Sequence, residues 1–174
     1  MGDRMARNGR AGRDVAGLVL RVAVGGTMIA HGLKHGRTLD GTAGWFSSIG
    51  FREPRLQAQA SAVVEVGSGA LLVAGVATPA AAAAVVGTMA VAVRSVHAPN
   101  GFFITAEGWE YVTNLAAAAV ALAAVGPGRI SVDHAAGWAT RFSGPGAAAF
   151  AAGVGLAAAA GQLALFHRPP QKAE

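Results

Sequence analysis

The sequence predicts an all-α membrane protein, a bundle of four transmembrane helices with a further Ala/Gly-rich helix at its C-terminal end. Apolar residues make up 53% of the chain and charged residues only 13%, about half the charged share of a soluble domain. Several apolar stretches can cross a hydrocarbon core of roughly 30 Å at about 1.5 Å per helical residue. Because backbone groups in lipid must be paired internally, such stretches are helices.

The four predicted spans are rich in alanine, which favours helix, and contain glycine, which lets helices approach closely. Arg21 interrupts the first apolar run and no A-x-A-like site follows it, so a cleaved signal peptide is not expected. Thr78-Pro79 leads directly from the second span into the third, which makes these two spans antiparallel neighbours. The spans comprise residues 15–36, 56–78, 80–97 and 109–125.

A further stretch of mostly alanine and glycine covers residues 146–166, with Gln162 as its only strongly polar residue. Alanine is near neutral for membrane insertion and glycine is unfavourable, so two arrangements stay open. The stretch is either a fifth helix packed on the bundle or a re-entrant or surface-lying helix. The predicted organisation is a basic cytoplasmic tail (1–14), a transmembrane bundle (15–135) and a C-terminal extension (136–174).

The distribution of charge predicts orientation rather than nucleic-acid binding. The net charge is +5, but the spans divide the basic residues among separate loops, so no continuous patch is expected. Arginines cluster ahead of the first span and predict a cytoplasmic N-terminus in the plasma membrane. Arg21 is expected to snorkel toward that side. The chain has no cysteine, so any redox function must use a bound cofactor. The clustered arginines are Arg4, Arg7, Arg10 and Arg13.

Alternate passes through the bilayer place the ionisable residues of the spans in the same half of the membrane. Such residues are costly in lipid and are expected to face the bundle interior. Glu65 and Arg94 could form a buried ion pair that fixes helix packing, and the histidines could be satisfied residues at the interface. The converging residues are His31, Glu65, Arg94, His97 and Glu110.

Helical spacing adds further residues to this polar cluster and limits the ligands that the cluster could bind. His31 and His35 are four residues apart, as are Ser61 and Glu65, so each pair shares a helix face. No second histidine pair exists, and no metal site is predicted. A quinone fits better, because its ring carbonyls need donors such as histidine and its tail needs lipid. Histidine and a buried carboxylate could also exchange protons with it. Nearby aromatic residues form either an interfacial belt or a lid: Trp45, Phe46, Phe51, Phe102, Phe103 and Trp109.

Six segments in order resemble the DoxX family of bacterial integral membrane proteins: HGLKHG (31–36), GTAGWFSSIGF (41–51), VVEVGSGALLVAG (63–75), VHAPNGFF (96–103), EGWEY (107–111) and GPGRISVD (126–133). The resemblance implies a four-helix membrane bundle. It also implies an association with terminal quinol oxidase, thiosulfate:quinone oxidoreductase, or membrane redox and oxidative-stress complexes. The chain departs from the family pattern at Thr78-Pro79 and after about His134. The family's motif positions fall on His31, Glu65, His97, Asn100 and Glu110.

The sequence thus predicts a membrane accessory subunit of a redox system, which interacts with quinone or anchors a soluble oxidoreductase at the lipid bilayer. A scaffold or assembly protein without chemistry is the first alternative, and a small-solute or proton conductor is the second. No residue is assigned a catalytic step. The predicted cofactor-binding residues are His31, Glu65, Arg94, His97, Asn100 and Glu110.

Overall fold

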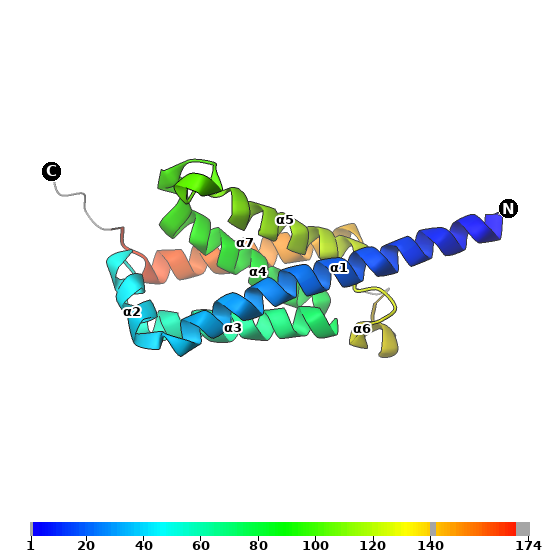
Figure 1. The fold of residues 1–174 in the computed structure, drawn as a ribbon, viewed down its shortest axis with the longest axis horizontal. Helices are drawn as coiled ribbons and strands as arrows, with labels where there is room; N and C mark the ends of the chain where they lie inside the picture. Colours follow the sequence, from blue (N-terminus) through cyan, green and yellow to red (C-terminus); the bar gives the residue numbers. More distant parts are fainter. Residues whose placement is uncertain (1, 140–141, 170–174) are drawn as a thin grey trace.

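A computed structural model describes residues 2–139 and 142–169, and long helices dominate it (Figure 1). Short helices lie at the two ends of the bundle, α2 (Leu39–Ser48) at one end and α6 (Val132–Ala135) at the other, where the N-terminal part of α1 extends beyond it. A π-helical turn (Val93–His97) extends α4 toward a loop with two 3₁₀ turns, Ala98–Asn100 and Ile104–Ala106. The long helices are α1 (Gly2–Arg37), α3 (Pro54–Ala74), α4 (Thr78–Ala92), α5 (Glu110–Val125) and α7 (Pro145–Phe166).

The prediction of a membrane bundle is confirmed. The set of helices long enough to span the membrane differs from the predicted set by one helix. Four helical stretches of the described chain are long and apolar enough to cross a membrane: Gly9–Arg37, Pro54–Ala74, Thr78–Asn100 and Pro145–Phe166. The fourth predicted span, 109–125, corresponds to α5, which has 16 residues. Such a helix is about 24 Å long, shorter than the hydrocarbon core. The C-terminal helix α7, with 22 residues, is long enough.

Helix α7 packs along α4 as an integral part of the bundle, which favours the packed-helix arrangement over the surface-lying one. A Cβ added at Gly155 would lie 2.6 Å from the carbonyl oxygen of Ala83, so only glycine allows this approach. Gln162 donates from Nε2 to Oε1 of Gln57 at 2.8 Å, which satisfies the polar residue of α7 inside the bundle. The buried side of α7 repeats every four residues, at Ala147, Ala151, Gly155 and Ala159.

The path of the chain predicts that its two ends lie on opposite sides of the membrane. The N-terminal end of α1 and the C-terminal end of α7 lie at opposite ends of the bundle, because the short helix α5 returns the chain to the α6 end before α7 begins (Figure 1). Reporter fusions measure this directly, with a fluorescent reporter that matures only in the cytoplasm and a phosphatase active only outside it. We expect the two termini to activate different reporters. Activation of the same reporter by both termini would contradict this arrangement.

Glycines also bring α1 and α3 into backbone contact. A Cβ added at Gly69 would lie 2.5 Å from the carbonyl oxygen of Gly25, and one added at Gly25 would lie 2.6 Å from that of Gly69. Close approach of this kind is how membrane helices gain packing energy without a hydrophobic driving force between them. The contact sets the separation of α1 and α3 at mid-length, and with it the separation of side chains nearer the α2 end.

Enlarging Gly69 is expected to destabilise the bundle. The Gly69→Val variant must push the backbones of α1 and α3 apart, and overpacking typically costs about 1–3 kcal/mol. Gly67→Val is the matched control, because it lies on the same helix and a Cβ there would meet no atom within 4 Å. Thermal unfolding in detergent should show a lower Tm for Gly69→Val than for Gly67→Val. Equal Tm values would show that the contact contributes little.

At the α6 end of the bundle, Arg21 ties three segments together. Its side chain is buried at 3% exposure and donates to the carbonyl oxygen of Leu72 at 2.8 Å and of Pro127 at 3.0 Å. It also donates to the carbonyls of Val73 and Ile130. The Val73 carbonyl at the end of α3 and two carbonyls of the loop after α5 thereby find a donor, whereas the Leu72 carbonyl also accepts from the backbone N–H of Gly75. The expected snorkelling of Arg21 is therefore wrong, because the guanidinium faces the protein interior.

Asp133 joins the same end of the bundle by capping α4 from a distant part of the chain. Its Oδ1 accepts from the backbone N–H of Ala77 at 2.8 Å, and its Oδ2 from that of Thr78 at 3.0 Å. The Thr78 hydroxyl donates to Oδ2 as well, at 2.7 Å. A carboxylate at a helix N-terminus is stabilised by these orphan donors and by the helix dipole. The tight turn before α4 is therefore fixed by Asp133 rather than by its own N-cap residue.

Candidate functional site

The α2 end of the bundle is built on a small aromatic core. Phe46 and Phe51 are buried at 7% and 5% exposure, and their rings pack edge to face at 5.1 Å between centroids. The ring centroids of Phe51 and His167 are 4.9 Å apart. The Nε2 atom of His167 lies 3.0 Å from the carbonyl oxygen of Ile49. The residue after α7 therefore fixes the segment after α2, and α2 lies across the end of α1 and α3 (Figure 1).

A carboxylate and an imidazole meet between α3 and α1 beneath α2. Glu65 is buried at 3% exposure, and its Oε1 lies 3.1 Å from Nδ1 of His35. The Ser61 hydroxyl donates to the same oxygen. Within the described ranges, Oε2 of Glu65 is buried with no hydrogen-bond partner. A buried carboxylate oxygen without a partner is costly, so this pair is a candidate site for binding or proton exchange.

A glycine explains why the carboxylate lies against α1. A Cβ added at Gly32 would come within 2.8 Å of the Cβ of Glu65 and the backbone nitrogen of Val66. The absence of a side chain at Gly32 therefore lets α3 approach α1 at the level of Glu65. His35 follows Gly32 by three residues, close to one helical turn, and reaches the carboxylate at this level. The motif HGLKHG thus supplies both the space and the partner for Glu65.

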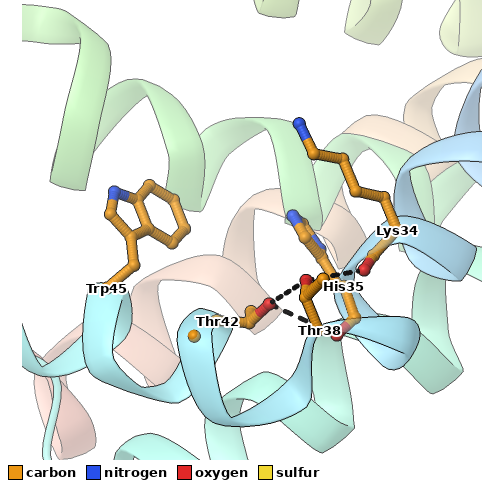
Figure 2. Close-up of a pocket in the computed structure, with 6 residues that line it drawn as sticks. Lys34, His35, Thr38, Thr42 and Trp45 are labelled. Atoms are coloured by element: carbon orange, nitrogen blue, oxygen red, sulfur yellow. Dashed lines mark hydrogen bonds between the residues drawn. The ribbon is translucent and has the colours of Figure 1, made fainter.

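A pocket of about 340 Å³ opens beside this pair, between the end of α1 and α2 (Figure 2). Trp45 stands on one side and Lys34 and His35 on the other, with Thr38 and Thr42 between them. The Thr38 hydroxyl donates to the carbonyl of Lys34 at 2.9 Å, and the Thr42 hydroxyl to that of His35 at 3.2 Å. These bonds fix the wall that links α1 to α2. The pocket thus presents an ammonium, an imidazole, hydroxyl groups and an indole at the end of the bundle.

A second, apolar groove of about 420 Å³ lies between α1 and α3 at the same level of the chain. It begins beside Gly32 and has one charged residue, Arg37, in its lining. A groove of this composition on a membrane helix pair is suited to a hydrocarbon chain. Its lining residues are Gly32, Leu33, Gly36, Arg37, Ala62, Val63, Val66 and Gly67.

Three predicted site residues instead brace the loop between α4 and α5. His97 Nδ1 lies 2.6 Å from the carbonyl oxygen of Glu107, and Asn100 Nδ2 donates to the same oxygen at 3.4 Å. Glu110 accepts from the backbone N–H of Ile104 at 3.1 Å. The ring of Phe102 packs edge to face on that of Trp109, with 4.8 Å between the ring centroids. These contacts hold the loop in shape, and its polar groups are largely used in doing so.

The structure therefore divides the predicted residues between two places at the same end of the bundle. Glu65 lies in the pair with His35, whereas His97, Asn100 and Glu110 lie in the loop after α4. His31 and Arg94 are exposed. Arg94 forms no ion pair with any described residue, so the predicted Glu65–Arg94 pair is wrong, and His35 takes the place of Arg94.

The residues that the sequence prediction left out of the site come mainly from the segment after the first span. His35 shares the helix face of His31, and the i, i+4 spacing indicated both without distinguishing them. Among the aromatic residues, Phe46 and Phe51 belong to the core, whereas Trp45 is 43% exposed and lines the pocket. Lys34, Thr38 and Thr42 line it as well. The position of these residues depends on the helix α2, which lies between the first two predicted spans.

The fold and site define a multi-helix membrane bundle with a polar pocket at one end. The family model described as DoxX matches residues 16–98. This segment runs from α1 to the turn after α4 and includes His35, Glu65 and the whole pocket. This match confirms the family resemblance carried by the sequence motifs. The family is one of membrane proteins generally linked to redox or stress-related functions. No curated protein matches the chain. No solved structure matches it.

Proposed function

We propose that this protein is an integral membrane accessory subunit of a redox system and that it binds a quinone in the pocket beside His35. The observation that carries the proposal is the His35–Glu65 pair, whose Nδ1–Oε1 distance is 3.1 Å, next to a pocket at the end of a membrane bundle. A quinone needs donors at its ring oxygens and an apolar environment for its tail. The pocket supplies the donors, and the surrounding lipid suits the tail.

The hydrogen-bond arrangement suits proton exchange at a ring oxygen. If Nδ1–H of His35 donates to Glu65, a neutral imidazole keeps a lone pair on Nε2, and a protonated one carries a second N–H there. Reduction of a quinone to a quinol takes up two electrons and two protons. A soluble oxidoreductase partner would supply the two electrons, the His35 ring would donate one proton to the ring oxygen beside it, and water at the open end of the pocket would supply the second proton. Glu65 would stabilise the charged imidazole while it does so.

The proposal is tested by the binding of a short-chain ubiquinone analogue and a menaquinone analogue to the protein in lipid nanodiscs. We expect saturable binding by the wild type, measured by isothermal titration calorimetry. His35→Ala should weaken it at least about tenfold, because a buried or charge-assisted hydrogen bond is worth about 1.5–3 kcal/mol.

His31→Ala is the matched control, since His31 is exposed one turn earlier on the same helix. We expect this variant to bind as the wild type does. The absence of binding to the wild type, or equal loss in both histidine variants, would contradict the proposal.

The contacts made in the α4–α5 loop favour a packing role for the members of the predicted polar cluster that lie there. His97, Asn100 and Glu110 satisfy backbone groups of the α4–α5 loop, as a scaffold protein without chemistry would require. A scaffold would retain its partners in co-purification when His35 is replaced by alanine and would show no quinone binding. The calorimetric measurement therefore separates the two functions.

A further inference from the structure

We propose that the apolar groove between α1 and α3 binds one anionic phospholipid, with an acyl chain in the groove and the phosphate on Arg37. The groove has a volume of about 420 Å³ and shares no lining residue with the polar pocket between α1 and α2. The inference therefore does not depend on quinone binding. It assigns a lipid site to the outer face of the bundle and makes Arg37 the residue that binds the headgroup.

Glycines keep the groove open on the side of the bundle that faces lipid. A Cβ added at Gly36 would lie 3.6 Å from the Cβ of Ala62, and one added at Gly67 would meet no atom within 4 Å. Val63 in the same lining is 72% exposed on a membrane-spanning helix, so the groove opens toward lipid. An empty groove would lose van der Waals contacts along its walls. An acyl chain restores these contacts without moving a side chain.

The two ends of the groove differ in polarity in the same order as a phospholipid. Its inner end lies beside Gly32, where α1 touches α3 at Val66. Its outer end lies at Arg37, the last residue of α1, at the end of the bundle that α2 crosses (Figure 1). The five residues from Gly32 to Arg37 correspond to about 7.5 Å along the helix axis. A phosphate at Arg37 thus continues into a chain that points toward the middle of the bundle.

The charge at the outer end selects the headgroup. Arg37 is exposed and forms no ion pair with any residue that the structure describes. Asp40, three residues later, is paired with Arg55 at 2.7 Å. A guanidinium can bind two phosphate oxygens at once, and basic residues at the membrane surface attract anionic lipids. The outer end of the groove therefore favours a phospholipid with a net negative charge.

A second copy of the chain is the competing occupant, and the charge of the groove disfavours it. Two copies packed on this face about a twofold axis along the membrane normal would present the same residues to each other. Both Arg37 side chains would then lie at one level of the membrane within a single interface, where like charges repel. An anionic phospholipid neutralises this charge instead.

Native mass spectrometry of the protein in detergent tests the headgroup part of the proposal. With increasing phosphatidylglycerol, we expect one retained lipid per protein, and phosphatidylcholine should bind at least about fivefold more weakly. Arg37→Gln should weaken phosphatidylglycerol binding by a similar factor and abolish the preference. Arg52→Gln is the matched control, because Arg52 is an exposed arginine at the same end of the bundle, outside the groove. It should bind as the wild type does.

A second pair of variants tests the groove itself. Gly67→Leu fills the groove with a side chain, whereas Gly26→Leu adds the same side chain on α1, outside the groove, where a Cβ also meets no atom within 4 Å. We expect Gly67→Leu to lose the bound phosphatidylglycerol and Gly26→Leu to retain it, with the helices of both confirmed by circular dichroism. Equal binding of the two lipids by the wild type, or equal binding by Arg37→Gln and Arg52→Gln, would contradict the proposal. Dimers that Gly67→Leu abolishes, without lipid adducts, would show that a second copy occupies the groove.

Discussion

Replacement of Arg21 by methionine is expected to destabilise the bundle by about 3 kcal/mol or more. The guanidinium, 3% exposed, donates to four backbone carbonyls, those of Leu72, Val73, Pro127 and Ile130. The Leu72 carbonyl keeps the N–H of Gly75, and each of the other three buried acceptors that loses its donor costs about 1–3 kcal/mol. Methionine preserves the length and apolar stem of the side chain, so the loss of stability measures the contribution of the hydrogen bonds. Denaturant unfolding in detergent micelles measures the change in free energy.

The control for Arg21 is Arg13→Met. Arg13 is an exposed arginine of α1, eight residues before Arg21. Its removal should change the free energy of unfolding by less than about 0.5 kcal/mol, as is usual for surface substitutions. Similar losses in the two variants would mean that Arg21 contributes through net charge or membrane orientation rather than through the carbonyls that it contacts.

Replacement of Asp133 by alanine is expected to cost about 2–4 kcal/mol. Asp133 is 4% exposed and accepts from the backbone of Ala77 and from the backbone and hydroxyl of Thr78. Loss of a helix N-cap alone costs about 0.5–2 kcal/mol, and the buried Thr78 hydroxyl would also lose its acceptor. Hydrogen exchange should increase for the backbone amides at the start of α4. Asp133→Asn, which keeps one carbonyl oxygen, should lose roughly half as much stability.

Asp40→Ala provides the comparison for Asp133. Asp40 pairs with Arg55 at 2.7 Å, but its side chain is 86% exposed, and exposed pairs contribute about 0–1 kcal/mol. We expect little change in stability. If Asp133→Ala were as mild as Asp40→Ala, the carboxylate would not fix the turn before α4.

The fold was predictable because span length and hydropathy are local properties of the sequence. The first three spans and the tight turn at Thr78-Pro79 were recognised from such signals, and they correspond to α1, α3 and α4. The C-terminal helix was ambiguous because its alanine and glycine carry little insertion energy. Its place in the bundle depends on the fit of Gly155 against Ala83, a contact between segments far apart in sequence.

The candidate site was predictable only in part, for a different reason. Depth in the membrane follows from counting residues along a span, and this placed Glu65 correctly at the α2 end of the bundle. The rotation of each helix about its axis decides which side chains meet. It places His35 against Glu65, leaves His31 and Arg94 exposed, and depends on the missing side chain at Gly32. Arg21 was assigned to the surface because the backbone carbonyls that it satisfies carry no sequence signal.

Photolabelling with an azido-quinone tests the location of the proposed site most directly. The wild-type protein in nanodiscs is illuminated with the probe and digested, and the labelled peptides are identified by mass spectrometry. We expect label within residues 34–45, which contain Lys34, His35 and Trp45 of the pocket, and its loss when excess unlabelled quinone is added. Competed label confined to residues 97–110, or no competed label at all, would contradict a quinone site between α1 and α2.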